Sequence, residues 1–140
     1  MMAQHVRDIM TSDLVTVEPQ ASVASVARLM RDEDVGTVLV TEEGHLKCLV
    51  SDRDLVVRAF AEGVDPDQTT VIQAASDDLV TIGPDESVDR AVELMREHAV
   101  RRLPVVEGDA AVGIIALGDL AIERDETSAL GDISAAKPNA

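Results

Sequence analysis

Apolar and polar residues follow two different periods along the first half of this chain. Short apolar runs at 15–17, 38–40 and 46–50 have the length and β-branched content of strands, and Pro19 follows the first of them. Ser22 then stands where the N-cap hydroxyl of a helix is expected. Apolar residues recur after it at helical spacing, at Val23, Val26, Ala27 and Met30. The pattern therefore predicts a strand, a helix and two further strands.

The same order of elements returns 65 positions later, the distance from Leu14 to Leu79. The offset holds without a gap as far as Asp54 and Asp119, which is typical of two copies of one supersecondary unit. It predicts further strands at 80–82, 103–106 and 112–116, and a helix whose apolar stripe contains Val88, Ala91, Val92 and Met95. Each copy ends in a second helix, which runs from Asp52 toward Gly63 and from about Leu117 to Arg124.

Each copy thus reads as a β-α-β-β-α unit of an α/β fold, in which helices cover one face of a sheet. A lone copy would leave its other face bare, so we expect two copies related by a pseudo-twofold axis to form one integrated module. The predicted organisation is a first repeat at 5–63, a connector at 64–70, a second repeat at 71–124 and a loose C-terminal tail at 125–140.

Composition narrows the partners that such a module can take. A net charge of −15 repels phosphate polymers, and one Phe with no Trp or Tyr leaves no aromatic platform for unpaired bases, so nucleic acid is disfavoured. No stretch approaches the roughly 18 apolar residues of a membrane span, and the N-terminus lacks the apolar core of a signal peptide. We therefore expect a cytoplasmic protein without a membrane partner.

The sequence LVSDRDL, at 49–55, passes from an apolar strand directly into a polar turn. A helix starting at Ser51 would present unpaired amides to a phosphate, and Arg53 could add a charge-assisted contact. Asp54 has two acceptor oxygens, which match the two hydroxyls of a vicinal diol such as ribose. The same residues also have the pattern of a capping box, which needs no ligand. Both interpretations remain open at this turn.

The equivalent stretch IIALGDL, at 114–120, keeps the acid as Asp119 but has Ala116 in place of the serine. Without that hydroxyl the pattern cannot form a capping box, yet the carboxylate persists. This comparison favours a role for the two aspartates beyond capping.

Two copies of this unit, each with an apolar strand, a polar turn and an Asp, resemble the CBS domain pair, or Bateman module, over roughly residues 5–124. The connector and the sequence VRRLPVV are similar to the stand-alone bacterial CBS-pair proteins, including the hypoxic response protein group. In that family the turn has the motif Gly, two apolar residues, Thr or Ser, two variable residues, Asp. The resemblance implies that the hydroxyl and nearby amides hold a phosphate, while the Asp holds the ribose of an adenosine ligand.

Carried over to this chain, the resemblance gives Ser51 the phosphate contact and gives Asp54 and Asp119 the ribose contacts. Cys48 stands where the motif has Gly, and Ala116 where it has the second hydroxyl. Losing one phosphate hydrogen bond costs about 1–3 kcal/mol, so we expect the first site to bind phosphate better, provided that Cys48 does not crowd the ligand.

Four further residues are candidates for the same pocket. Arg101 and Arg102 could face the cleft between the copies and neutralise a polyphosphate, or they could lie at an exposed helix end among acidic neighbours. Thr16 and Thr81, which match across the copies, could line the pocket or serve simply as strand residues.

The sequence thus predicts a non-enzymatic regulatory module with no obligatory cofactor. It would bind AMP, ADP, ATP or S-adenosylmethionine between its repeats and signal in trans, as a homodimer, to another protein. No catalytic triad or Walker-type loop appears, and His5, His45 and His98 lack the spacing of a metal site.

Two alternatives stand beside this prediction. Cys48 and Ala116 both depart from the motif, which suits a dimeric scaffold or stress-response interaction protein with degenerate nucleotide sites. Cys48 could instead act as a redox sensor, although its position in an apolar run favours an inert, buried thiol.

Overall fold

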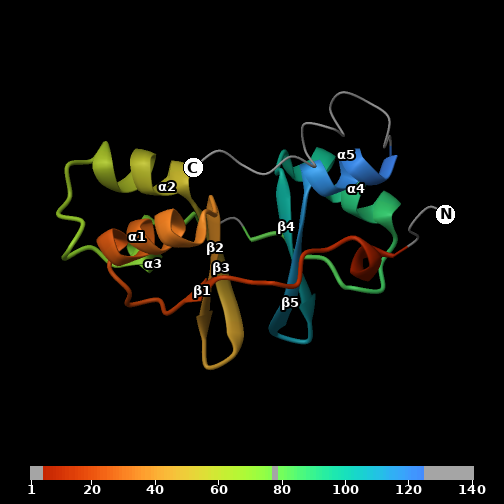
Figure 1. The fold of residues 1–140 in the computed structure, drawn as a ribbon, viewed down its shortest axis with the longest axis horizontal. Coiled ribbons are helices and arrows are strands. Elements are labelled where there is room, and N and C mark those ends of the chain that lie inside the picture. Colours follow the sequence, from red (N-terminus) through yellow and green to blue (C-terminus); the bar gives the residue numbers. More distant parts are fainter. Residues whose placement is uncertain (1–4, 77–78, 125–140) are drawn as a thin grey trace. The chain divides into compact units, whose positions relative to one another are not determined.

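The computed structural model of the protein describes residues 5–76 and 79–124, which fall into two compact units (Figure 1). We call them the first-repeat unit, with residues 14–76 and 79, and the second-repeat unit, with residues 5–13 and 80–124. The boundaries of these units are not those of the sequence repeats, because the residues that begin each repeat belong to the unit of the other repeat.

The first-repeat unit is a three-stranded sheet with helices packed against it (Figure 1). Strand β1 (Thr16–Val17) is parallel to β2 (Thr37–Glu42), which is antiparallel to β3 (His45–Ser51). The hairpin turns at Glu43 and Gly44, which both have positive φ. The helices are α1 (Val23–Glu33), α2 (Asp52–Leu55) and α3 (Val71–Ala74). After α2 the chain continues as a π-helical turn, η2 (Val56–Phe60), whose residues precede a turn at Gly63 as the sequence predicted.

The second-repeat unit repeats this plan with a shorter sheet. Strands β4 (Arg102–Glu107) and β5 (Ala110–Ala116) form an antiparallel pair. The strand predicted at 80–82 is reduced to a single parallel bridge between Ile82 and Val105. The helices are η1 (Val6–Asp8), α4 (Val88–His98) and α5 (Leu117–Arg124).

The two long helices begin where their serines predict. The Ser22 hydroxyl accepts the Ser25 amide over 3.1 Å, and the Ser87 hydroxyl accepts the Arg90 amide over 3.1 Å. The predicted apolar stripes are buried in the cores at all but two residues. Val92 is only partly buried, and Ala27 is exposed, because the buried face of α1 is narrower than the spacing suggested.

The first helical turn of the first repeat, η1, packs in the second-repeat unit, and that of the second repeat, α3, packs in the first-repeat unit. Val6, at the start of η1, is fully buried in the core of the second-repeat unit, and its amide donates to the Glu86 carbonyl over 2.9 Å. Val71, at the start of α3, is fully buried in the core of the first-repeat unit, and its amide donates to the Ala21 carbonyl over 2.7 Å. These contacts are equivalent under the 65-residue offset, so the repeats exchange their first turns reciprocally.

No helix among the described residues has the length and apolar character needed to cross a bilayer. The tail predicted at 125–140 lies outside the described residues.

Candidate functional site

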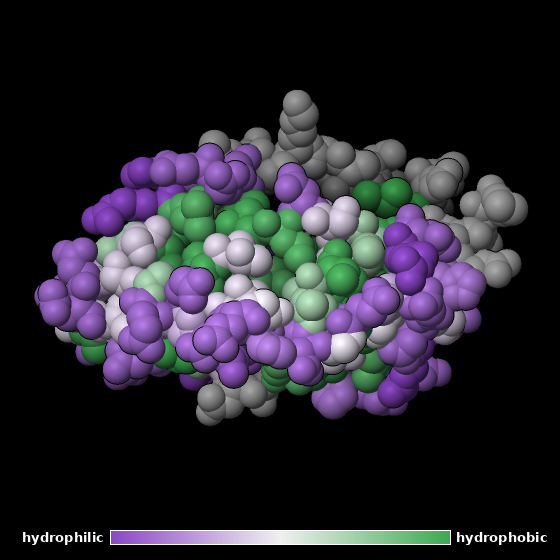
Figure 2. All heavy atoms as spheres, turned by 90° about the horizontal axis from the view of Figure 1, so that it is seen from below, coloured by the Kyte–Doolittle hydropathy of each residue, from purple (hydrophilic) through white to green (hydrophobic). Residues whose placement is uncertain are grey.

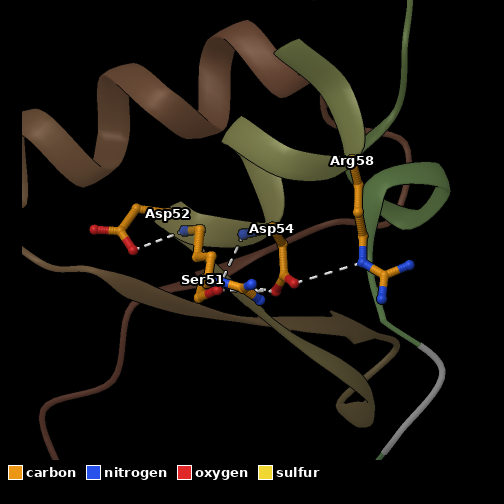
Figure 3. A network of polar contacts seen from close by, with 5 residues as sticks. Ser51, Asp52, Asp54 and Arg58 are labelled. Atoms are coloured by element: carbon orange, nitrogen blue, oxygen red, sulfur yellow. Dashed lines mark hydrogen bonds and ion pairs between the residues drawn. The ribbon is translucent and has the colours of Figure 1, made fainter. Parts of the chain in front are cut away.

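The polar turn between β3 and α2 is closed by a complete capping box (Figure 3). The Ser51 amide donates to Asp54 Oδ2 over 2.8 Å, and the Asp54 amide donates in return to Ser51 Oγ over 3.2 Å. The Ser51 hydroxyl also donates to Asp54 Oδ2, over 3.0 Å. The structural interpretation of this sequence is therefore present in the molecule, and a ligand has to bind a turn that is already well ordered.

The other amides of this turn are also committed within the protein. The Asp52 amide donates to the Gly36 carbonyl over 2.9 Å, and the Arg53 amide donates to Asp52 Oδ1 over 2.8 Å. The expectation that a helix starting at Ser51 offers unpaired amides to a phosphate is therefore wrong, because neighbouring side chains satisfy the donors that such a helix start normally leaves open. An anion at this turn has to be held by side chains.

The two arginines near this turn differ in their pairing with carboxylates. Asp54 is half-buried, and its Oδ1 lies 3.7 Å from Nε of Arg58, one helical turn further along (Figure 3). Arg53 is exposed, and no described residue pairs with its guanidinium. Asp54 Oδ1 accepts no hydrogen bond from the described residues, so one of its two oxygens caps the helix while the other has only the ion pair with Arg58.

The second repeat keeps half of the capping box. The Ala116 amide donates to Asp119 Oδ2 over 2.8 Å, which is the bond that Ser51 makes to Asp54 in the first repeat. A complete capping box is absent, as the sequence predicted, but the inference that capping does not explain this acid is wrong, because the reciprocal bond needs the backbone of residue 116 and not its side chain. Asp119 Oδ1 again has no donor among the described residues.

The environment of Asp119 is less favourable to its charge. Burial raises the pKa of Asp119 above 3.8, and the hydrogen bond from the Ala116 amide opposes this only in part. No arginine of the described residues pairs with Asp119, whereas Arg58 lies beside Asp54. The two aspartates thus share a position but differ in electrostatic setting.

The residue across the strand pair from each turn also differs between repeats. Thr37 on β2 is the register partner of Ser51, and Arg102 on β4 is the register partner of Ala116. A hydroxyl pair in the first repeat is thus replaced by a guanidinium and a methyl group in the second. Arg101 and Arg102 are exposed, and no described residue pairs with either guanidinium.

Thr16 and Thr81, the remaining candidates, are both exposed. Thr16 lies on β1 opposite Leu39, two strands away from Ser51 in the sheet order, and Thr81 lies beside the Ile82 bridge. Within the first-repeat unit the sheet and turn bring Ser51, Arg53 and Asp54 together, with Thr16 on the outer strand. Sequence reasoning missed Thr37, because counting back from the hairpin turn pairs it with Val50, and only the β-bulge between Val40 and Thr41 shifts its partner to Ser51.

Cys48 and Gly113 are equivalent residues with different packing. A Cβ on Gly113 would lie 2.5 Å from Met10 Sδ and 3.1 Å from the Thr11 carbonyl oxygen, so the first turn of the chain fills this space. In the first repeat, the residue equivalent to Met10 is Ala75, which packs against the core cluster that contains the buried Cys48. In one pair the larger residue is Met10, which lies against Gly113, and in the equivalent pair it is Cys48, which shares a core with Ala75. Packing thus accounts for a cysteine at this position and places its thiol inside the protein.

A cavity of 590 Å³ lies between α4 and α5 within the second-repeat unit. Its lining is mostly apolar, with two arginines: Val92, Met95, Arg96, Ala99, Val100, Arg101, Leu117, Leu120 and Ala121. Sequence reasoning did not predict it, because it depends on how two helices pack.

Apolar side chains also reach the surface of both units. Val56, Val57 and Phe60 are exposed on η2, and Leu117 is exposed on α5. Figure 2 shows hydrophobic residues in green beside hydrophilic ones in purple on the face that it presents. Among residues 5–76 and 79–124, no group of three His, Cys, Asp or Glu side chains is placed to hold a metal ion.

The duplicated β-α-β-β-α unit and its two aspartate turns define a tandem CBS protein. A model of the CBS domain matches residues 6–60 and 66–125, so the chain belongs to the CBS domain family and the resemblance seen in the sequence is confirmed. It is a regulatory module of the CBS-pair type.

Two relatives and two solved structures show the breadth of this similarity. The CBS domain-containing protein YhcV of Bacillus subtilis is 40% identical over 126 residues, covering 90% of this chain and 89% of YhcV. Hypoxic response protein 1 of Mycobacterium tuberculosis is 31% identical over 116 residues, covering 82% of this chain and 81% of that protein. A crystal structure of Hypoxic Response Protein I, with two coordinated zinc ions, matches with a TM-score of 0.77 at 30% identity, covering 85% of this chain and 98% of that chain. The hexameric CBS-CP12 protein from bloom-forming cyanobacteria matches with a TM-score of 0.78 at 27% identity, covering 89% and 70%.

Proposed function

We propose that this protein is a non-enzymatic sensor whose aspartate turns bind the ribose of an adenosine-containing ligand. The observation that carries the proposal is that Asp54 and Asp119 each use Oδ2 for the helix start and leave Oδ1 without a hydrogen-bond donor. A half-buried carboxylate oxygen is a strong acceptor, and a ligand hydroxyl would supply the missing donor. AMP, ADP, ATP and S-adenosylmethionine all carry such hydroxyls.

A phosphate on this ligand would be held by side chains rather than by helix amides. Arg101 and Arg102 support this assignment, because they are exposed cations without a partner among the described residues and follow directly after α4. Arg53 offers a similar but single cation at the first turn. The prediction that Ser51 contributes a phosphate contact stays a prediction, although its hydroxyl proton is already used by Asp54.

The first experiment uses the absence of Trp and Tyr, which leaves the protein nearly transparent near the adenine band. An absorbance spectrum of the purified protein, followed by mass spectrometry of the released small molecules, would detect and identify a co-purified ligand. Calorimetric titration with AMP, ATP and S-adenosylmethionine would then give the affinity.

Asp54→Asn is the decisive variant for the ribose assignment. Its side-chain oxygen can still accept the Ser51 amide, so the cap is kept, while the second oxygen is replaced by a donor. We expect affinity to fall about tenfold with little change in stability. Unchanged affinity in both Asp54→Asn and Asp119→Asn would contradict the proposal.

The signal would pass to a partner protein through a homodimer. Exposed apolar side chains on η2 and α5 support self-association, because burying them would remove apolar area from water. The hexameric state of the CBS-CP12 protein supports the same proposal from a structural relative.

One observation favours a second candidate, a ligand-free scaffold. Asp54 and Asp119 both cap helices, so their presence can be explained without a ligand. This candidate predicts no adenine band and no thermal shift with any of the three ligands, whereas the sensor predicts both.

A further inference from the structure

Thr37 carries the one side-chain polar atom that is buried without a hydrogen-bond partner in the described part of the chain. Its Oγ1 is inaccessible to solvent and makes no hydrogen bond. Leaving a buried hydroxyl unpaired costs about 1–3 kcal/mol, so such groups are rare in folded proteins. The position of this group therefore needs an explanation.

Thr37 lies at the turn that carries the proposed ligand site. It is the first residue of β2 and the register partner of Ser51, the last residue of β3. Directly opposed residues of an antiparallel pair place their side chains on the same face, with Cβ atoms about 5 Å apart. Ser51 in turn lies 3.0 Å from Asp54 Oδ2, so the unpaired hydroxyl is next to the network drawn in Figure 3.

The neighbouring hydroxyl does not satisfy Thr37 in this structure. Ser51 Oγ donates to Asp54 and accepts from the Asp54 amide, so its proton and one lone pair are committed. Thr37 is then an unused uncharged donor, and Asp54 Oδ1 accepts no hydrogen bond from the described residues and has only the ion pair with Arg58 at 3.7 Å. A ligand hydroxyl can accept a hydrogen bond from the first and donate one to the second.

We propose that Thr37 is a specificity-determining residue of the first repeat, whose hydroxyl donates a hydrogen bond to a ligand hydroxyl that itself donates to Asp54 Oδ1. This inference rests on the proposed function and specifies which part of the ligand the first repeat recognises. A phosphate does not suit the pair, because at neutral pH it has no proton to donate to Asp54 and its charge is repelled by the carboxylate.

The hydroxyl can reach a ligand by a small movement. Thr37 as a whole is only half-buried, so atoms other than Oγ1 reach the surface. Rotation about the Cα–Cβ bond exchanges the positions of the hydroxyl and the methyl group, and threonine occupies more than one staggered rotamer. Ligand binding would favour this rotation, because the ligand supplies the hydrogen-bond partner that Thr37 lacks in the free protein.

The second repeat gives an internal comparison. Its equivalent strand pair is Arg102 opposite Ala116, so the uncharged donor is replaced by a cation and the adjacent hydroxyl is lost at the same time. The first repeat is thus suited to a sugar hydroxyl and the second to an anionic group. Adenosine and AMP should bind the first repeat with similar affinity, whereas removal of the sugar hydroxyls should weaken binding there.

Thr37→Val tests the inference because it keeps the shape of the side chain and removes the hydroxyl. Two effects of opposite sign are expected. The melting temperature of the free protein should rise by about 3 °C, because an unpaired buried hydroxyl is removed. The affinity for adenosine, followed through the amide NMR signals of residues 37–54, should fall about tenfold, and the preference for adenosine over 2′,3′-dideoxyadenosine should shrink.

Thr41→Val is the matched control, since it makes the same change on the same strand. The Thr41 hydroxyl, unlike that of Thr37, is not buried without a hydrogen-bond partner. Thr41→Val should therefore neither raise the melting temperature nor lower the affinity for adenosine. Unchanged adenosine affinity in Thr37→Val, or a lower melting temperature, would overturn the inference. Binding of AMP that moves only second-repeat signals would overturn it while the proposed function stands, and no binding of adenosine, AMP, ATP or S-adenosylmethionine would overturn both.

Discussion

The Asp119 carboxylate accepts the Ala116 amide over 2.8 Å, without the serine hydroxyl that the equivalent Asp54 receives from Ser51. Burial raises the pKa of Asp119 above 3.8, since a single amide only partly replaces the lost hydration. The charged form of the aspartate at this position is therefore less well stabilised in the second repeat than in the first.

This difference predicts a pH dependence for Asp119→Asn. In the wild type, a carboxyl whose pKa is raised by folding stabilises the fold below pH 3.8 and loses that contribution as pH rises through the raised pKa. The asparagine variant lacks this titration. The unfolding free energy of the wild type minus that of the variant should fall as pH increases above 3.8, as measured by urea denaturation across a pH series. A difference that grows with pH would contradict the cause given for the shift.

The contact of Met10 with Gly113 predicts an energetic coupling. Gly113→Ala should lower the free energy of unfolding by about 1–3 kcal/mol, because the new methyl group meets Met10 Sδ and the Thr11 carbonyl. Combining it with Met10→Ala should cost less than the sum of the two single changes, since the pair then resembles Ala75 with Cys48 in the first repeat. Chemical denaturation of the four proteins gives the coupling. Strict additivity would show that the two residues do not compete for space.

The first turn of the chain predicts contrasting effects at adjacent residues. Val6 is fully buried in the core of the second-repeat unit, so Val6→Ala should lower the free energy of unfolding by about 2 kcal/mol. Arg7 makes an exposed ion pair with Asp85 at 2.7 Å, and Arg7→Ala should change stability little because water screens the pair. Equal losses measured by urea denaturation would show that η1 is held by charge rather than by burial.

The exposed aromatic side chain predicts an effect on assembly rather than on folding. Phe60 is 83% exposed, so Phe60→Glu should leave the melting temperature nearly unchanged. If the exposed apolar side chains of η2 (Val56, Val57 and Phe60) form a self-association surface, the variant should lower the mass measured by light scattering after size-exclusion chromatography. The matched control is Arg58→Glu on the same turn, which changes charge without removing an apolar side chain. An oligomer unaffected by Phe60→Glu would place the interface elsewhere.

Local patterns predicted the elements well because their causes are local. Ser22 and Ser87 start helices through bonds to amides three residues away, and the 65-residue offset carried that interpretation from one repeat to the other. The half capping box at Asp119 was missed because a side-chain pattern cannot show a bond made by the backbone of Ala116.

Features that depend on distant residues were not predicted. The packing of Val6 on the second-repeat unit requires contacts with residues about eighty positions away, such as Glu86. The unpaired hydroxyl of Thr37 is visible only when the surroundings of every polar atom are known. The candidate site was therefore located by its turn residues, while the electrostatic difference between its two aspartates became visible only in the structure.

The exchange of first turns has a consequence for synthesis of the chain. Because a ribosome makes the N-terminus first, Val6 emerges long before β4 and β5, with which it shares a core. The first-repeat unit can close once Ala74 has left the ribosome exit tunnel, while the core around Val6 is completed only by Leu120 of α5. The first turn of the first repeat is thus among the last segments to be packed.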